Sequence, residues 1–316
     1  MKKIVFSLLM LVPFGLVSCF SGASESSTEE IETQKMQQQV DSLYKKMSQA
    51  ERVAQLYGIR SSEVVENGKL SLQKCREKIP NGIGHVCQYA CALDLGPNEL
   101  RDFVRDSQNY LINETPLGVP AIFYEEAIIG LAAKGTTVYP QQLGVACSWN
   151  PELATVNTEQ TAEVMRSVGA TLALSPMVDL IRTAYWPRIE ESYGEDGYLS
   201  PAMGVAFIEG LQKNGLKDGV AACTKHFWGY GGGSSLTWKE IFEEVLMLHE
   251  AMIRLADCKV LMTSYGRFRS EQAVSSDTLL NKILRGYLEF DGLVVGDYGA
   301  VEHSSQKGNP EILKQR

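Results

Sequence analysis

Asp291-Gly-Leu-Val-Val-Gly-Asp-Tyr-Gly299 contains a short apolar run, Leu293 to Val295, set between glycines. A run of this kind is typical of a strand that is buried on both faces, as in a parallel sheet. Asp297 follows directly, at the carboxyl end where open α/β sheets and α/β barrels place their reactive groups. A carboxylate in this position can act as a catalyst, hold a ligand or cap the next helix. The stretch alone leaves these three roles open.

The rest of the chain alternates between short apolar runs and longer segments whose apolar residues recur at helical spacing. Strands are predicted at 83–89, 119–124, 143–147, 171–178, 220–227, 260–265 and 293–296. Helices are predicted at 40–57 with a break near Ser48, around 100–111, at 203–211, at 238–255, and after a cap at Ser276 or Asp277. This alternation indicates βα units around a parallel sheet.

Polar side chains gather just after the apolar runs. They are Glu125, Glu126, Asp179, Arg182, Lys225, His226, Tyr265 and Asp297. Because many strand ends converge on one rim in an α/β barrel, this distribution favours a TIM-type (β/α)8-like barrel over a doubly wound sheet. The chain stops at Arg316, which leaves room for one helix after Asp297 and for no eighth strand. We therefore expect the barrel to be incomplete at its C-terminal end.

Composition excludes some classes of function. The 316 residues are 44% hydrophobic and 22% charged, which is ordinary for a globular protein with a sizeable core. The formal net charge is −8, and no basic stripe interrupts it. This balance argues against a nucleic-acid partner and is compatible with a neutral substrate.

The N-terminus has the pattern of an export signal. Lys2 and Lys3 precede an apolar stretch, 4–17, that is too short to cross a membrane as a helix. Small residues flank Cys19, and this spacing resembles a bacterial lipoprotein signal, in which residues 1–18 are removed and Cys19 is lipidated. The alternative is an ordinary secretory signal with a chance cysteine. We expect an exported protein in the periplasm or at the outer membrane, attached to the membrane only by the lipid.

Residues 19–37 are rich in Ser, Glu and Thr and nearly free of large apolar side chains. A segment of this composition cannot form a core and predicts a flexible tether. The folded domain is therefore expected to span residues 38–316.

Seven cysteines are present, and export would permit disulfides among them. Three lie in strand-like apolar runs, where cysteine usually behaves as a small buried hydrophobe: Cys147, Cys223 and Cys258. His85, Cys87 and Cys91 are close in sequence, but their spacing matches no zinc pattern. We expect neither a metal site nor a cofactor.

Several motifs follow one another along the chain between residues 48 and 300. They are VAQLYG (53–58), GVPAIFYEEAIIG (118–130), TVYPQ (137–141), WPRIEESYGED (186–196), TKHFWGYG (224–231), LMTSY (261–265) and GLVVGD (292–297). Together and in this order they resemble glycoside hydrolase family 3, the β-glucosidase and β-xylosidase family. The resemblance implies the N-terminal barrel domain of that family.

The resemblance also implies roles for individual residues. Asp297 falls on the nucleophile, which forms a covalent glycosyl-enzyme in a retaining glycosidase. The positions that match sugar-binding residues of the family are Glu126, Arg188, Lys225 and His226, with Tyr265 lining the same pocket. Both members of the Lys225–His226 pair can reach one ligand only if the strand ends and the backbone turns there. Trp186 and Trp228 are candidates for stacking on a sugar face, with packing as the alternative reading.

This sequence departs from the family pattern at several positions. Pro187 stands where relatives have glycine, and its ring fixes φ just before Arg188. Gly266 and Gly296 replace the asparagine and serine that relatives often have. Leu248-His-Glu250 stands where a proline and an aromatic residue are common.

The general acid/base is the largest departure. The β-N-acetylhexosaminidase branch takes it from an Asp/His pair in the loop after the Lys-His-Phe motif, but residues 231–238 read GGGSSLTW. The glucosidase and xylosidase branch takes a glutamate from a second α/β domain, which we expect to be absent from a truncated chain. That domain, separately encoded, would be a partner.

The sequence thus predicts a retaining, exo-acting β-glycosidase that releases terminal glucose or a similar sugar from a β-linked oligosaccharide or glycoside. One alternative is a catalytically incomplete or decayed sugar-binding lipoprotein, a fragment without turnover. Another is that the chain does not fold alone, because a missing last strand exposes a sheet edge.

Overall fold

The computed structural model describes residues 22–213, 215–230, 236–269 and 271–302, and the chain divides into two compact units, residues 1–52 and 53–316. The described part of the first unit is helix α1 (Gly22–Lys46) and most of α2 (Gln49–Ala54). The break between them falls near Ser48, as predicted. Glu51 accepts a hydrogen bond from the Ser48 N–H at 2.8 Å, and the Ser48 hydroxyl accepts one from the Glu51 N–H at 3.3 Å. This reciprocal cap starts the second helix.

The prediction of a flexible tether over 19–37 was wrong for residues 22–37, which form the first part of α1. The segment contains four Glu and two Gln, which favour helix without needing a core. Its apolar side chains Ile31 and Met36 are exposed. Composition therefore predicted that this segment forms no hydrophobic core, but it did not predict the helical backbone. Cys19 and the predicted signal lie outside the described residues.

The second unit is built on a seven-stranded parallel sheet in the order β1-β4-β5-β6-β7-β8-β11. The strands are β1 (Gly58–Arg60), β4 (His85–Cys87), β5 (Ile122–Glu125), β6 (Leu172–Ala173), β7 (Ala221–Phe227), β8 (Val260–Thr263) and β11 (Leu293–Gly296). Each strand of this sheet pairs with the strand of the same sheet that follows it in the chain, as in a barrel. Within the described ranges β11 and β1 remain the two edges, so the predicted incomplete barrel is confirmed.

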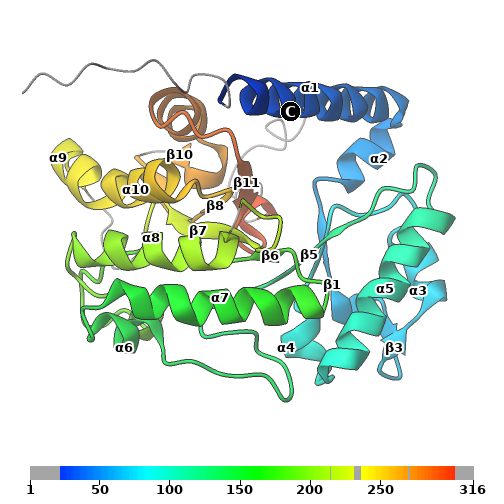
Figure 1. Cartoon of the computed structure of the whole chain (residues 1–316), viewed down its shortest axis with the longest axis horizontal. Helices are drawn as coiled ribbons and strands as arrows, with labels where there is room; N and C mark the ends of the chain where they lie inside the picture. The colour runs from blue at the N-terminus through cyan, green and yellow to red at the C-terminus, as the bar shows by residue number, and fades with distance from the viewer. Residues whose placement is uncertain (1–21, 214, 231–235, 270, 303–316) are drawn as a thin grey trace, which may run out of the picture. The chain divides into compact units, whose positions relative to one another are not determined.

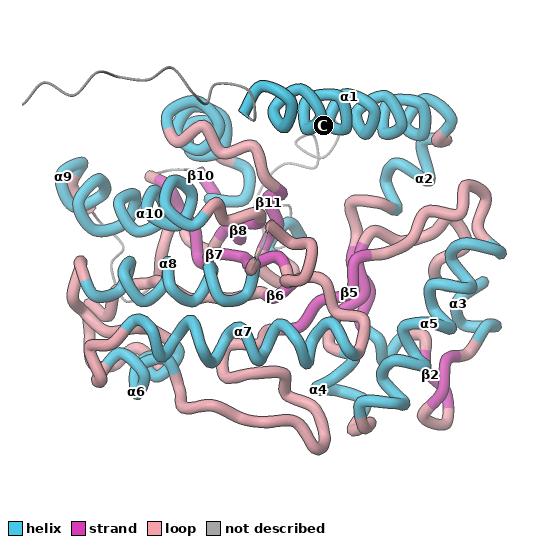
Figure 2. The backbone as a smooth tube through the Cα atoms, in the orientation of Figure 1, coloured by secondary structure: helices cyan, strands magenta, loops and turns pink. Residues whose placement is uncertain are grey.

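Helices cover the outside of this curled sheet (Figures 1 and 2). They are α3 (Leu72–Lys78), α4 (Tyr89–Leu93), α5 (Pro97–Glu114), α6 (Gln142–Ala146), α7 (Pro151–Ser167), α8 (Leu199–Gln212), α9 (Trp238–Glu240), the π-helix η3 (Ile241–Leu246), α10 (Met247–Ala256) and the π-helix η5 (Thr278–Tyr287). Short elements complete the unit: η1 (Ser61–Glu63), β2 (Val65–Glu66), β3 (Lys69–Leu70), η2 (Ile189–Glu191), β9 (Arg267–Phe268), β10 (Glu271–Gln272) and η4 (Ala273–Ser275).

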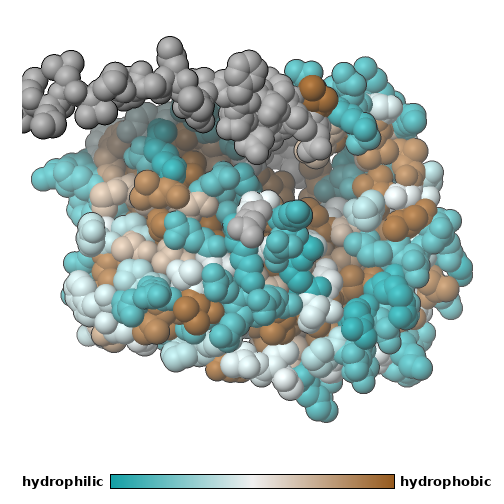
Figure 3. Space-filling view, in the orientation of Figure 1, coloured by the Kyte–Doolittle hydropathy of each residue, from teal (hydrophilic) through white to brown (hydrophobic). Residues whose placement is uncertain are grey.

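Helices α7 and α8 lie side by side in Figure 1 and pack closely. Gly210 makes this approach possible, because a Cβ there would collide with the Thr155 backbone and the Thr158 hydroxyl of α7. The Thr155 hydroxyl also donates to the Ala206 carbonyl of α8 at 3.1 Å. On the face shown in Figure 3, hydrophobic residues are scattered among hydrophilic ones, as is usual for globular proteins.

Three elements, α6, β1 and α7, differ from the sequence-based predictions. Residues 143–147, predicted as a strand, belong to helix α6 and its C-cap. Five apolar residues are too few for periodicity to separate a strand from a short helix. Strand β1, which follows the helix predicted at 40–57, was not predicted. Only Ile59 of its three residues is buried, so the sequence shows no alternation of apolar and polar residues there. Helix α7 was not predicted.

The core has an outer and an inner part. The outer cluster joins strand residues to the covering helices, for example Ala222 to Met203 and Met252. The inner cluster consists of barrel residues alone: Cys87, Tyr124, Leu172, Leu174, Cys223, Val260 and Met262. Alternation along β7 therefore sends Cys223 inward and Ala222 outward. Since Lys225 is two residues beyond Cys223, its side chain is directed to the interior of the barrel.

The cysteines behave as expected in two of three cases. Cys223 and Cys258 are buried, whereas Cys147 is exposed because it follows α6 rather than lying in a strand. All six cysteines from Cys75 onward have free thiols. In the described ranges, no helix has the length and apolarity needed to cross a membrane, and no group of three or more His, Cys, Asp and Glu side chains is placed to hold a metal ion.

Candidate active site

Asp297 lies at the carboxyl end of β11 and is 8% exposed. Its N–H donates to the Thr263 carbonyl at 3.1 Å, which continues the β8–β11 ladder by one residue and fixes the backbone. The Tyr230 hydroxyl donates to Asp297 Oδ2 at 2.9 Å, and the Tyr298 N–H donates to Oδ1 at 2.8 Å. Both carboxylate oxygens are therefore held in place at the rim of the barrel.

Lys225 and His226 are both buried at this rim, although they are adjacent in β7. Lys225 is opposite Met262 and Phe227 is opposite Thr263, so His226 is an extra residue in a β-bulge. The peptide bond between Lys225 and His226 is cis. The expectation that the strand ends at this pair was wrong, since β7 continues through Phe227. The bulge, rather than a turn, lets both side chains reach the site.

Lys225 crosses to the neighbouring strand end. Its ammonium group forms an ion pair with Glu126, which follows β5, while the Lys225 side chain itself is 2% exposed. A buried ammonium needs such a partner, because desolvation without one costs several kcal/mol. The Glu126 side chain is 39% exposed, so this pair reaches from the interior to a surface that a ligand can touch.

His226 connects two carboxylates. Its Nδ1 lies 2.7 Å from Asp179 Oδ2, and its Nε2 lies 3.7 Å from Asp297 Oδ2. Asp179 also accepts from the N–H groups of His226 at 3.2 Å and Tyr230 at 2.7 Å. Burial raises the pKa of Asp179, but the nearby His226 and these hydrogen bonds more than offset it, so the pKa lies below its ordinary value. Asp179 thus fixes the His226 ring toward Asp297.

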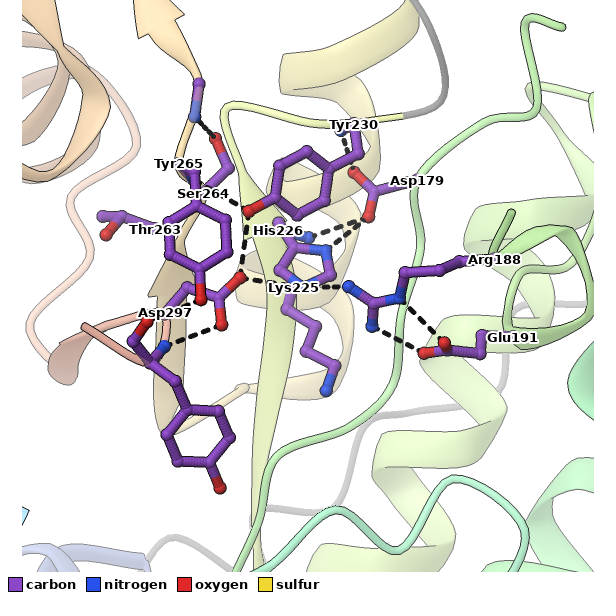
Figure 4. Close-up of polar contacts among 12 residues, drawn as sticks. Asp179, Arg188, Glu191, Lys225, His226, Tyr230, Thr263, Ser264, Tyr265 and Asp297 are labelled. Atoms are coloured by element: carbon purple, nitrogen blue, oxygen red, sulfur yellow. Dashed lines mark hydrogen bonds and ion pairs between the residues drawn. The ribbon is translucent and has the colours of Figure 1, made fainter. Parts of the chain in front are cut away.

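Arg188 enters from the long loop between β6 and α8. It forms two parallel hydrogen bonds to Glu191, at 2.7 and 2.6 Å, and its Nη1 lies 3.4 Å from His226 Nε2. Burial raises the pKa of Glu191, but the hydrogen bonds and charge of Arg188 outweigh it and leave that pKa lowered. With Pro187 before it, Arg188 still points into the cluster, as Figure 4 shows.

Tyr265 closes the side of the site next to β8. Its hydroxyl donates to the Tyr298 carbonyl at 2.6 Å, and its N–H donates to the Tyr230 hydroxyl at 2.8 Å. Burial and the negative charge of Asp297 raise the pKa of Tyr265 to about 12, so the phenol is protonated at neutral pH. Its side chain remains partly exposed and can contact a ligand.

Comparison with known proteins identifies the fold. Residues 48–315 match the model described as the Glycosyl hydrolase family 3 N terminal domain. The chain belongs to glycoside hydrolase family 3. It is 39% identical over 199 residues to a β-xylosidase of Formosa agariphila, covering 57% of this chain and 28% of that protein.

Solved structures share the fold of this chain. A β-glucosidase from Listeria innocua, determined with laminaribiose, has a TM-score of 0.73 and 26% identity, covering 87% of this chain and 39% of that chain. A β-N-acetylhexosaminidase from Beutenbergia cavernae shares the fold, with a TM-score of 0.69 and 21% identity over 84% of this chain and 82% of that chain. The chain thus spans well under half the length of the β-xylosidase and β-glucosidase relatives.

The family 3 barrel brings together the residues that the sequence singled out. Asp297, His226 and Arg188 lie in one contact network, and Tyr265 borders it (Figure 4). Lys225 and Glu126 form an ion pair beside this network. Trp228 packs edge to face on Phe268 with ring centroids 4.7 Å apart. This contact supports packing rather than sugar stacking for Trp228.

Three further residues take part that the sequence did not assign a role. Tyr230 and Glu191 lie inside quoted motifs, and Asp179 was noted only as a polar residue after a strand. Tyr230 contacts Asp297 directly, while Asp179 pairs with His226 and Glu191 pairs with Arg188. The signals in the sequence were the motifs that contain Tyr230 and Glu191 and the place of Asp179 just after a predicted strand. Neither signal says which side chains meet.

Proposed function

We propose that this chain forms the nucleophile-bearing barrel of an exported, retaining, exo-acting β-glycosidase that acts on terminal β-linked glucose or a similar sugar. The supporting observation is the Asp297 carboxylate, buried at a strand end and held through both oxygens. Relatives named β-glucosidase and β-xylosidase, one determined with glucose, favour a hexose or pentose substrate.

The geometry suits attack by a fixed carboxylate. In a retaining glycosidase one carboxylate attacks the sugar and forms a covalent intermediate, which water later hydrolyses. The Tyr230 and Tyr298 hydrogen bonds orient Asp297 before the substrate arrives, so little reorganisation is needed at the moment of attack. The 3.7 Å contact with His226 adds a polar neighbour that is itself oriented by Asp179.

Sugar hydroxyls would be held by the groups around Asp297. Lys225 and Arg188 are donors, and Glu126 is an acceptor that also reaches the surface. A cluster of charged donors and acceptors suits a ligand rich in hydroxyl groups.

The general acid is proposed to come from outside this cluster. Glu126, Asp179 and Glu191 each pair with a cationic or imidazole side chain. For Asp179 and Glu191 the pKa lies below its ordinary value, which disfavours the protonated form that a general acid needs. We infer that another segment, such as a C-terminal α/β domain or a separately encoded partner, donates the proton to the leaving group.

Covalent trapping tests the nucleophile. Incubation with a 2,4-dinitrophenyl 2-deoxy-2-fluoro-β-glycoside should add one sugar mass to the wild-type protein, and peptide mapping should place it on Asp297. Asp297→Asn should not be labelled. Labelling of this variant at full stoichiometry would falsify the assignment. The activated leaving group needs little protonation, so this test does not depend on the general acid.

A second candidate function is a sugar-binding lipoprotein without turnover, favoured by the ion-paired state of the other carboxylates in the cluster. Titration calorimetry with glucose, xylose and N-acetylglucosamine separates the two. Binding without covalent trapping supports the binding protein, and trapping supports the glycosidase.

A further inference from the structure

His249 lies in α10, behind the bulge of β7, and is 1% exposed. It belongs to the Leu248-His-Glu250 segment, which departs from the proline and aromatic residue common in relatives. Its Nδ1 lies 3.2 Å from the Thr224 hydroxyl, and its ring also hydrogen-bonds to the backbone of His226. Its ring packs edge to face on Phe227, with centroids 5.1 Å apart.

These three contacts fall on the residues around the bulge. Thr224 precedes Lys225, and Phe227 follows His226, so His249 touches both ends of the two-residue segment that carries the site's central side chains. Alternation along β7 directs Thr224 to the helix side and Lys225 to the barrel interior. His249 therefore contacts this backbone segment from the helix side. The opposite side of the same segment directs Lys225 and His226 toward Asp297.

We propose that His249 is a positioning residue, which fixes the β7 bulge so that Lys225 and His226 are aimed at the sugar bound beside Asp297. It acts through Thr224 and the His226 backbone and touches neither the substrate nor the reacting atoms. The proposal rests on the proposed glycosidase function and adds to it a determinant of the site's geometry.

The electrostatic surroundings agree with this role. Burial lowers the pKa of His249 to about 4, against the opposing effect of the nearby Asp179 carboxylate. The ring is thus neutral at neutral pH, with one nitrogen that donates and one that accepts. A neutral ring can satisfy a hydroxyl and a backbone group together, whereas phenylalanine of similar shape would leave both without this partner.

The size of the effect follows from the precision that catalysis requires. A displacement of about 1 Å in the reacting geometry can reduce a rate by about 100-fold. Losing the support behind the bulge should shift Lys225 and His226 by less than this. We therefore expect the trapping rate of His249→Phe to fall about 10-fold, with a smaller change in sugar affinity.

The experiment measures the rate of covalent trapping by the 2-fluoro glycoside and, separately, the affinity for glucose by calorimetry. His249→Phe should be trapped about 10-fold more slowly, and His249→Asn, which keeps a polar atom near Thr224, should recover part of the rate. Met252→Ala is the matched control. Met252 is buried one turn further along α10, and its sulfur faces Gly204 of α8 rather than the bulge. It should lower stability and leave the trapping rate unchanged.

The outcomes separate this proposal from the proposed function. If the wild-type protein is not trapped at Asp297, the glycosidase function fails. If the wild-type protein is trapped and folded His249→Phe reacts at the same rate, the positioning role is refuted. A loss of rate in Met252→Ala equal to that in His249→Phe would also refute it, because general loosening of α10 would then explain both.

Discussion

Glu125 offers a test of the structure that does not depend on any enzymatic assay. It is the last residue of β5, is 3% exposed, and accepts a hydrogen bond from the Ala90 N–H at 2.8 Å. Burial raises the pKa of this carboxyl from its ordinary 4.5 to about 7, although the hydrogen bonds from Ala90 and Cys91 oppose the rise. The perturbation is Glu125→Gln, which keeps the shape and an acceptor for Ala90 but removes the titration.

The magnitude follows from linkage. Because the folded-state pKa is raised, Glu125 contributes stability that is fully present below pH 4.5 and is lost as the pH rises to 7. One pKa unit corresponds to about 1.4 kcal/mol, so the loss is about 3 kcal/mol. The free energy of unfolding of the wild-type protein relative to that of Glu125→Gln should therefore fall by about 3 kcal/mol between pH 4.5 and pH 8.

His249 titrates in the opposite sense. Its pKa is lowered by burial from 6.5 to about 4, so the unfolded chain takes up the proton first as the pH falls. Stability from this group is present above pH 6.5 and is lost toward pH 4, again by about 3 kcal/mol. Between pH 4.5 and 6.5 the two groups therefore change the free energy of unfolding of the wild-type protein in opposite directions. Each variant removes one group, so its pH profile shows the effect of the other.

The assay is urea unfolding followed by circular dichroism at pH 5, 6, 7 and 8, with wild type, Glu125→Gln and His249→Phe measured side by side. The free energy of unfolding of Glu125→Gln should rise more steeply with pH than that of the wild type. The free energy of unfolding of His249→Phe should instead fall as the pH rises. Identical pH profiles for wild type and Glu125→Gln, with matching native spectra, would refute the burial argument for Glu125.

Three further predictions concern the site and the N-terminus. Lys225→Met should leave Glu126 without its partner and weaken glucose binding at least about 10-fold by calorimetry; unchanged affinity would remove this pair from the sugar pocket. Tyr230→Phe removes a hydrogen bond to a carboxylate, worth about 1.5–3 kcal/mol, so the trapping rate at Asp297 should fall about 10- to 100-fold in stopped-time mass spectrometry. Cys19→Ser should abolish incorporation of radiolabelled palmitate and release the protein from the membrane fraction, and a palmitate signal that persists would contradict the proposed lipoprotein.

The sequence predicted most of the sheet because its strands are short apolar runs between glycines and polar rim residues. The expectation that the 293–295 run is buried on both faces was wrong, because β11 lies at an edge of the sheet and Leu293 is exposed. The run at 293–296 matches β11 residue for residue, and 220–227 contains all of β7. It failed where the local signal was short or ambiguous. Residues 143–147 read equally well as strand or helix, and Gly58–Arg60 is a strand only because it pairs with β4.

The site was predicted in part for the same reason. The resemblance to family 3 located Asp297, Lys225, His226 and Arg188, each beside a strand end or in the loop after one. It gave no account of how Lys225 and His226, which are adjacent, reach the same pocket. A β-bulge depends on the register between two strands, and the sequence of one strand alone does not determine that register.

Sequence by itself determined the βα order, the family, and the placement of Asp297 directly after a strand, because these depend on residues that are close in the chain. Only the tertiary structure decided what surrounds that carboxylate. His226 and Tyr230, at the end of β7, and Asp179, after β6, are far from Asp297 in the chain. They meet it because parallel strands bring their carboxyl ends to one rim. The hydrogen bonds and pKa shifts of the site depend on these long-range contacts and on burial, and a local sequence pattern predicts neither.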